Sequence, residues 1–121
     1  MKQIVQMTSE QLVELFTEIA LAEDDAMTGF DNSKFNRLFM QRMAVKEELK
    51  SRKGDQRRAL LRLYDHPNTH VRKSAAKATL ALAPQAARQI LQAIRESGEF
   101  IHAGDAGMTL RNLDRGVFKP T

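Results

Sequence analysis

The sequence contains no cysteine, no tryptophan and no long hydrophobic run. Without cysteine the chain forms no disulfide and offers neither a reactive thiol nor a thiolate ligand for a metal. No apolar stretch approaches the roughly 20 residues that a membrane-spanning helix requires. The first residues, MKQIVQMTSEQ, also lack the apolar core of a signal peptide. We therefore expect a cytoplasmic protein without membrane contact.

The charged residues are unevenly distributed, although the net charge is only +4. Residues 1–33 carry seven acids and one base, whereas residues 50–77 carry nine bases and two acids. A basic segment of this kind attracts acidic partners. It can equally be neutralised inside the molecule, if the acidic first helix lies near it. The sequence leaves both interpretations open.

Helical periodicity runs along the chain, and no segment has a convincing strand pattern. Thr8 and Gln11 form a capping box ahead of a first long helix. Asp31 or Ser33 can cap a second long helix, which carries Arg42 among its regularly spaced residues. Four of the six phenylalanines lie in or between these helices and predict a shared core: Phe16, Phe30, Phe35 and Phe39.

The second half predicts shorter helices, separated by turn residues. They are expected over 55–65, 69–83 and 84–97, followed by a last helix from near Asp105 to Gly116. Pro84 suits a first helical position, and Gly98 is a natural stop. We predict an all-α fold of five to six helices in one domain. Two longer helices occupy 8–52, and helical pairs occupy 55–116.

The helix expected over 69–83 is unusual because it is rich in alanine. On a helical wheel Val71, Ala75 and Ala78 share one side, and Leu80 lies almost opposite. Two apolar sides separated by small residues predict neighbouring helices on both sides. Small side chains allow helix axes to approach closely, as in stacked helical pairs.

The segment LLRLYDHPNTHVRKSAAKATLALA resembles one HEAT-type repeat: a leucine-rich helix, a Pro-containing turn, and a second helix with Val-Arg and Ala-Ala-x-Ala. The resemblance implies a compact superhelix in which Val71 is core and Arg72 bonds to a neighbouring turn. His66 stands where the repeat commonly has Asp. The whole chain, through KFNRLF, HPNTHVRKSAAKA, GDAGMTL and GVFKPT, also resembles the bacterial domain-of-unknown-function family numbered two-thousand-nineteen. That family implies the same helical fold and no established activity.

A histidine metal site is the first chemical possibility. His66 and His70 are four residues apart, a spacing that would bring two imidazoles together on a helix. Pro67 and Asn68 place them in a turn instead, and His102 is the only other histidine. We expect ordinary hydrogen bonds for these side chains and no metal.

Two further patterns suggest ion or phosphate loops. The acids of EDDAMTGFDN lack the alternation and closing Glu of a calcium loop and indicate a solvated helix end. GDAGMTL lacks the Lys-Ser/Thr pair of a phosphate loop, so we expect Asp105 to cap the last helix. No nucleophile elbow or apolar carboxylate pair is present. We expect no enzyme, no catalytic residue and no cofactor.

The basic middle supplies the candidate binding surface. Arg58 and Arg62 share one helical face, as do Lys73 and Lys77 on the next helix. We predict a non-catalytic adaptor or immunity-type module that binds an acidic protein through these four residues. The alternative is nucleic-acid binding by the basic 50–77 face, against which stand the acidic first third and the single tyrosine. A homo-oligomer is also compatible with the sequence.

Overall fold

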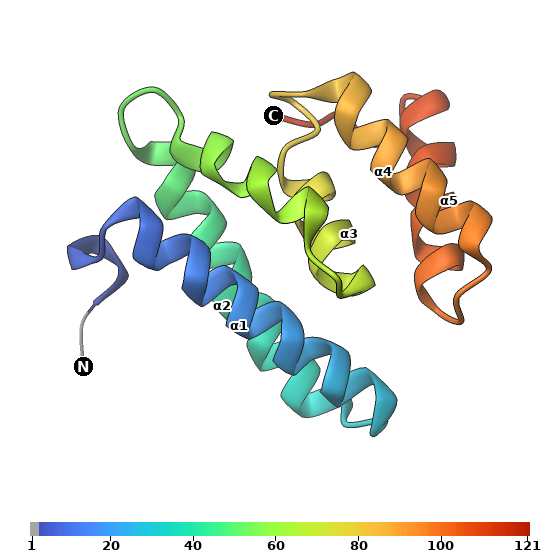
Figure 1. Ribbon diagram of the computed structural model, residues 1–121, viewed down its shortest axis with the longest axis horizontal. Helices are drawn as coiled ribbons and strands as arrows, with labels where there is room; N and C mark the ends of the chain where they lie inside the picture. Colours follow the sequence, from blue (N-terminus) through green and yellow to red (C-terminus); the bar gives the residue numbers. More distant parts are fainter. Residues whose placement is uncertain (1–2) are drawn as a thin grey trace. The chain divides into compact units, whose positions relative to one another are not determined.

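All the elements in residues 3–121, which the computed structural model describes, are helices (Figure 1). In chain order they are the 3-10 helix η1 (Ile4–Gln6), α1 (Ser9–Thr28), α2 (Asn32–Ser51), the 3-10 helix η2 (Gln56–Asp65), α3 (Thr69–Ala78), α4 (Pro84–Ser97) and α5 (His102–Asp114). The predicted all-α class is confirmed over this range. No helix within it is both long enough and apolar enough to cross a membrane.

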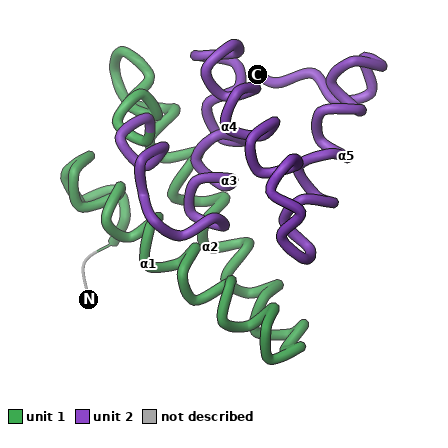
Figure 2. The backbone as a smooth tube through the Cα atoms, turned by 45° about the vertical axis from the view of Figure 1, so that its right-hand side comes forward, with its two compact units in different colours: residues 1–60 green, residues 61–121 purple. Residues whose placement is uncertain are grey.

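The chain divides into two compact units, residues 1–60 and 61–121 (Figure 2). The boundary between them falls inside η2.

Unit 1 is a hairpin of two long helices, α1 and α2, which pack along each other (Figure 1). The capping box is present: Thr8 Oγ1 accepts the Gln11 N–H at 3.0 Å, and Gln11 Oε1 accepts the Thr8 N–H at 2.9 Å. Asp31 caps α2 by accepting the backbone N–H of Lys34 at 3.0 Å. These local bonds fix both helix starts where the sequence predicts them.

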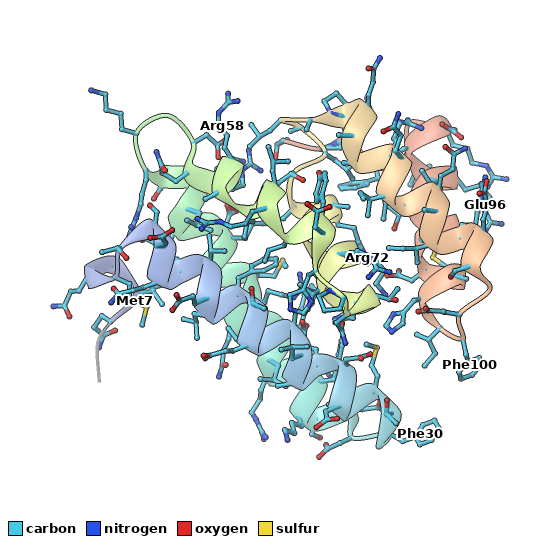
Figure 3. All side chains as sticks on the ribbon, viewed as in Figure 1. Met7, Phe30, Arg58, Arg72, Glu96 and Phe100 are labelled. Carbon is cyan, nitrogen blue, oxygen red and sulfur yellow. The ribbon has the colours of Figure 1, made fainter. Side chains whose placement is uncertain are left out.

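The predicted phenylalanine core is largely wrong. Phe16 is fully buried, but Phe30 is 79% exposed and Phe39 is 40% exposed. Phe30 lies at the α1–α2 turn with positive φ and points outward (Figure 3). In α2 only Arg42, Val45 and Leu49 are buried. A two-helix hairpin has one facing seam, so apolar residues away from that seam stay exposed.

The helix expected over 55–65 exists, but it is a 3-10 helix in η2. Its buried residues, Arg57, Leu60 and Leu63, recur at every third position, which matches three residues per turn. Asp55 precedes it in the left-handed region at φ 53°, a position that Asp tolerates better than most residues. The Asp55 carboxylate accepts two bonds from the Arg57 guanidinium, at 2.6 and 2.9 Å. This bidentate pair holds the start of η2.

Unit 2 is built on α3, which packs against both α4 and α5. Its core contains Ala76, Leu80, Ala87, Leu91, Ile94, Ala106 and Leu110. Seven of the ten residues of α3 are buried, so neighbours on more than one side surround the alanine-rich helix, as predicted. Helix α4 begins at Pro84 and is followed by Gly98 in the left-handed region, also as predicted.

Helix α3 is shorter than predicted, because it ends at Ala78 and not at Ala83. Thr79 closes it: its hydroxyl donates to the Ala75 carbonyl at 2.8 Å and lies 2.5 Å from the Tyr64 hydroxyl. Residues 79–83 turn toward α4, and the amides of Leu82 and Ala83 both donate to the Thr79 carbonyl. Leu80 is therefore buried from a turn, and the helical-wheel argument does not apply to it.

Candidate functional site

The four predicted surface cations lie in different environments. Arg58 belongs to unit 1 and is exposed (Figure 3), and Arg62 belongs to unit 2 and is also exposed. Lys73, on α3, is only 3% exposed, and Lys77 one turn later is half-buried. Lys73 and Lys77 therefore lie inside unit 2 or at its edge, whereas the two arginines face solvent.

A single carboxylate brings the two lysines together. Asp105 Oδ2 lies 3.0 Å from Lys73 Nζ and 3.3 Å from Lys77 Nζ. Burial alone would raise the pKa of Asp105, but the attraction of Lys73 and Lys77 and their hydrogen bonds outweigh it and lower the pKa below its usual 3.8. The carboxylate is thus held ionised between two cations from another helix.

Two histidines extend this ionic cluster along the α3–α5 seam. Lys73 Nζ is 3.0 Å from His102 Nδ1, and the His102 and His70 rings are 5.3 Å apart between centroids. His70 is only 3% exposed. We call Lys73, Lys77, Asp105, His70 and His102 the α3–α5 cluster.

The α3–α5 cluster overturns the expected role of Asp105 as a helix cap. Helix α5 begins at His102, three residues before Asp105, and its N-cap is Ile101 at φ 72°. Asp105 lies in the first turn of α5, where its negative charge interacts favourably with the positive end of the helix dipole. From there its carboxylate reaches Lys73 and Lys77 on α3. Sequence reasoning missed this position because the pairing joins residues 28 and 32 positions apart.

A second buried ion pair lies in unit 1. Glu23 on α1 is fully buried, and its Oε1 accepts from Arg42 Nε at 2.6 Å. The Arg42 guanidinium also lies over two aromatic rings, 5.6 Å from the Phe16 centroid and 5.5 Å from that of Phe39. The prediction of a solvated acidic helix end is wrong for Glu23. Helical spacing contained the signal, because Glu23 continues the apolar face of Phe16 and Ile19.

Neither the α3–α5 cluster nor the Glu23–Arg42 pair has the composition of a metal centre. Within residues 3–121 no three His, Cys, Asp or Glu side chains are grouped so that they could hold a metal ion. His66 instead accepts the Asn68 backbone N–H at its Nδ1 at 3.0 Å, and Asn68 caps α3 through the Val71 N–H. These are the ordinary turn interactions expected for His66.

The two units differ in charge. Counted from the sequence, unit 1 has ten bases and ten acids, whereas unit 2 has nine bases and five acids. The net charge of +4 therefore belongs to unit 2. Because Asp105 neutralises only part of the charge of Lys73 and Lys77, and other cations of unit 2 are exposed, this unit carries a positive surface. The exposed cations are Arg62, Arg95, Arg111, Arg115 and Lys119.

The geometry defines a small all-helical protein with buried ion pairs and one basic unit. The chain belongs to the DUF2019 family, whose model is described as a domain of unknown function and matches residues 10–114. This confirms the family resemblance read from the sequence. The crystal structure of the protein RPA1889 from Rhodopseudomonas palustris CGA009 is similar, with 50% identity over 100% of both chains and a TM-score of 0.96. Among curated proteins no relative matched the chain.

Proposed function

We propose that the chain is a cytoplasmic, non-catalytic protein-binding module whose basic unit 2 binds an acidic protein partner. The observation that carries this proposal is that the whole net positive charge belongs to unit 2, which contains nine bases and five acids. Exposed cations around a small helical unit create a potential that accelerates the encounter with an acidic surface. Arginine also offers forked hydrogen bonds to carboxylates.

The exposed arginines carry the binding in this proposal, whereas Lys73 and Lys77 stabilise the packing of α5 on α3. Arg62, Arg111 and Arg115 are exposed. Lys73 and Lys77 hold α5 on α3 through Asp105, and they contribute long-range charge without touching the partner.

We also propose that η2 and α3 form a HEAT-type pair. Supporting features are the fully buried Val71 and the guanidinium of Arg72, whose Nη1 donates to the carbonyls of His66 at 2.8 Å and Pro67 at 3.0 Å. Arg72 thus braces the turn that precedes its own helix. The 3-10 form of η2 and the presence of His66 in place of Asp depart from the repeat. HEAT-type pairs typically present extended faces to protein partners.

The test is affinity capture from a nuclease-treated lysate of the source organism, followed by association kinetics with the purified partner. The charge-reversed variant Arg111→Glu/Arg115→Glu should slow association about tenfold at low salt and weaken its salt dependence. The matched control, Lys34→Glu/Arg37→Glu, alters two exposed cations of α2 in unit 1 and should change the rate little.

Three results would contradict the proposal. Equal slowing by both double variants would show that net charge, and not unit 2, governs binding. Capture that disappears on nuclease treatment, with affinity falling steeply between about 50 and 200 mM salt, would favour the nucleic-acid alternative. Recovery of this same chain as the sole partner would identify a homo-oligomer, which light scattering would confirm.

A further inference from the structure

Unit 2 contains an open groove with a volume of about 420 Å³, whose lining includes no residue of the α3–α5 cluster. Its walls come from the turn after α3, the first two turns of α4, the end of α5 and the C-terminal tail. The residues that matter for its chemistry are Leu80, Pro84, Arg88, Leu113, Phe118 and Lys119.

The local sequence explains why a groove exists at this place. Helix α3 stops at Ala78, so residues 79–83 form a turn where a longer helix would have continued. Gly116, another residue of the lining, has φ 72° and reverses the chain after α5. The amides of Val117 and Phe118 then both donate to the Asn112 carbonyl, at 3.0 and 3.1 Å. These bonds hold the tail as one wall of the groove.

The groove combines an apolar floor with a basic rim. Leu80 is 3% exposed at the floor, and Leu113 packs against the core of unit 2. Arg88 and Lys119 are the charged residues of the lining, and no acid belongs to it. A ligand that fits must therefore present apolar surface next to negative charge.

Arg88 already binds a carboxylate of the chain itself. Its Nη1 donates to Asp114 Oδ1 at 3.0 Å, in a pair whose side chains are 40% and 68% exposed. An ion pair so open to solvent contributes little to stability. The guanidinium has five N–H donors, so a second carboxylate can bind beside Asp114 or replace it.

We infer that this groove binds an extended segment of a partner protein in which an apolar side chain neighbours an Asp or Glu. The apolar side chain lies on Leu80 and Leu113, and the carboxylate bonds to Arg88 while Lys119 supplies further positive charge. The open form of the groove suits a chain that enters and leaves along the surface. This inference rests on the proposed function, because the groove would hold one segment of the same acidic partner that the exposed arginines of unit 2 attract.

To test this, a display library of random peptides is selected against the full chain. The binding site of the selected peptides is then mapped from changes in the amide chemical shifts of the protein. We expect selected sequences with an apolar residue next to Asp or Glu, and shifts at Leu80, Leu113 and Phe118. Peptides with free and amidated ends should bind equally, because the acid is a side chain.

Two pairs of variants locate the binding energy. Arg88→Gln should weaken the selected peptides about tenfold, which is the loss of one charge-assisted hydrogen bond, whereas Arg95→Gln on the same helix should not. Ala81→Glu, an exposed residue of the lining, should weaken them by a similar or larger factor. Its control, Ala86→Glu, alters an exposed residue of α4 that lies outside the lining.

Several outcomes would overturn the inference. Selected peptides without acids, shifts confined to residues outside the groove, or equal effects of Arg88→Gln and Arg95→Gln would each do so. Shifts produced by laurate but not by peptides would assign the groove to a free amphiphile instead. If the acidic partner of the proposed function binds the Ala81→Glu variant normally, only the groove inference fails. If peptides bind the groove as expected but no acidic protein is captured, only the proposed function fails.

Discussion

The two units of this chain solve the problem of buried charge in opposite ways. In unit 1 one base meets one acid, and both Arg42 and Glu23 are almost inaccessible. In unit 2 two lysines share Asp105, whose side chain remains 36% exposed. The first arrangement is closed and neutral, whereas the second leaves positive charge at the surface. A basic segment can therefore stabilise helix packing through internal ion pairs and still determine the electrostatic potential at the surface.

The largest expected effect is the loss of the closed pair in unit 1. Glu23→Gln should lower the free energy of unfolding by about 3–5 kcal/mol, because it leaves the buried Arg42 charge uncompensated. The double variant Glu23→Leu/Arg42→Met should recover most of that loss, since it removes both charges. Urea denaturation of the three proteins measures this, and a loss below about 1 kcal/mol for Glu23→Gln would show that the pair is not buried as described.

The open cluster of unit 2 should be less sensitive and should distinguish its two lysines. Lys73→Met should cost about 1.5–3 kcal/mol, because the buried Lys73 bonds to a charged partner. Lys77→Met should cost less than about 1 kcal/mol, because its side chain is 39% exposed. Arg58→Met, at an exposed position, is the control and should change the free energy of unfolding by less than about 0.5 kcal/mol. Equal costs at Lys73 and Arg58 would mean that Lys73 belongs to an open basic face after all.

The alanine-rich helix α3 allows a test of packing within unit 2. Ala75 on α3 is fully buried, so Ala75→Leu should destabilise the protein by about 1–3 kcal/mol through overpacking. Ala78→Leu should act in the same direction. The control is Ala44→Leu on α2, where the side chain is exposed and the extra methylenes project into solvent. A neutral result at both Ala75 and Ala78 in thermal denaturation would show that α3 is not closely packed.

The smallest effect concerns pH. The pKa of Asp105 is lowered in the folded protein, so its ionised form stabilises the fold above its usual pKa of 3.8. This contribution is lost as the pH falls from about 4 through the lowered pKa. Asp105→Asn should therefore be less stable than the parent chain at neutral pH, and the gap should close below about pH 4. Urea titrations at several pH values would check this, and a gap that persists in acid would assign the effect to packing.

The sequence predicted most of what depends on neighbours along the chain. Thr8 with Gln11, Asp31, Pro84 and Gly98 mark helix ends, because each acts on amides or torsions within a few residues of itself. The class of the fold follows from the same local signals. The end of α3 at Ala78 was missed, since Thr79 closes it with help from Tyr64, 15 positions away.

For the candidate sites, the sequence indicated which charged residues share a helix. It did not indicate which acid pairs with which base. The sequence singled out Lys73 and Lys77 as a basic pair on one helix, and both do lie on α3. It could not reveal that Asp105 lies beside them, nor that Glu23 meets Arg42 between two phenylalanines. Those contacts join residues on different helices, and their energy depends on burial.

By itself, then, the sequence determined the all-α class, the N-terminal caps of α1 and α2, the family and the uneven charge, because these depend on composition and on interactions over a few residues. Only the tertiary structure decided which charges are buried, which phenylalanines are exposed and where the groove of unit 2 lies. The physical reason is that burial and ion pairing depend on distances in space between helices. Residues as far apart as Lys73 and Asp105 acquire such a distance only when α3 and α5 pack together.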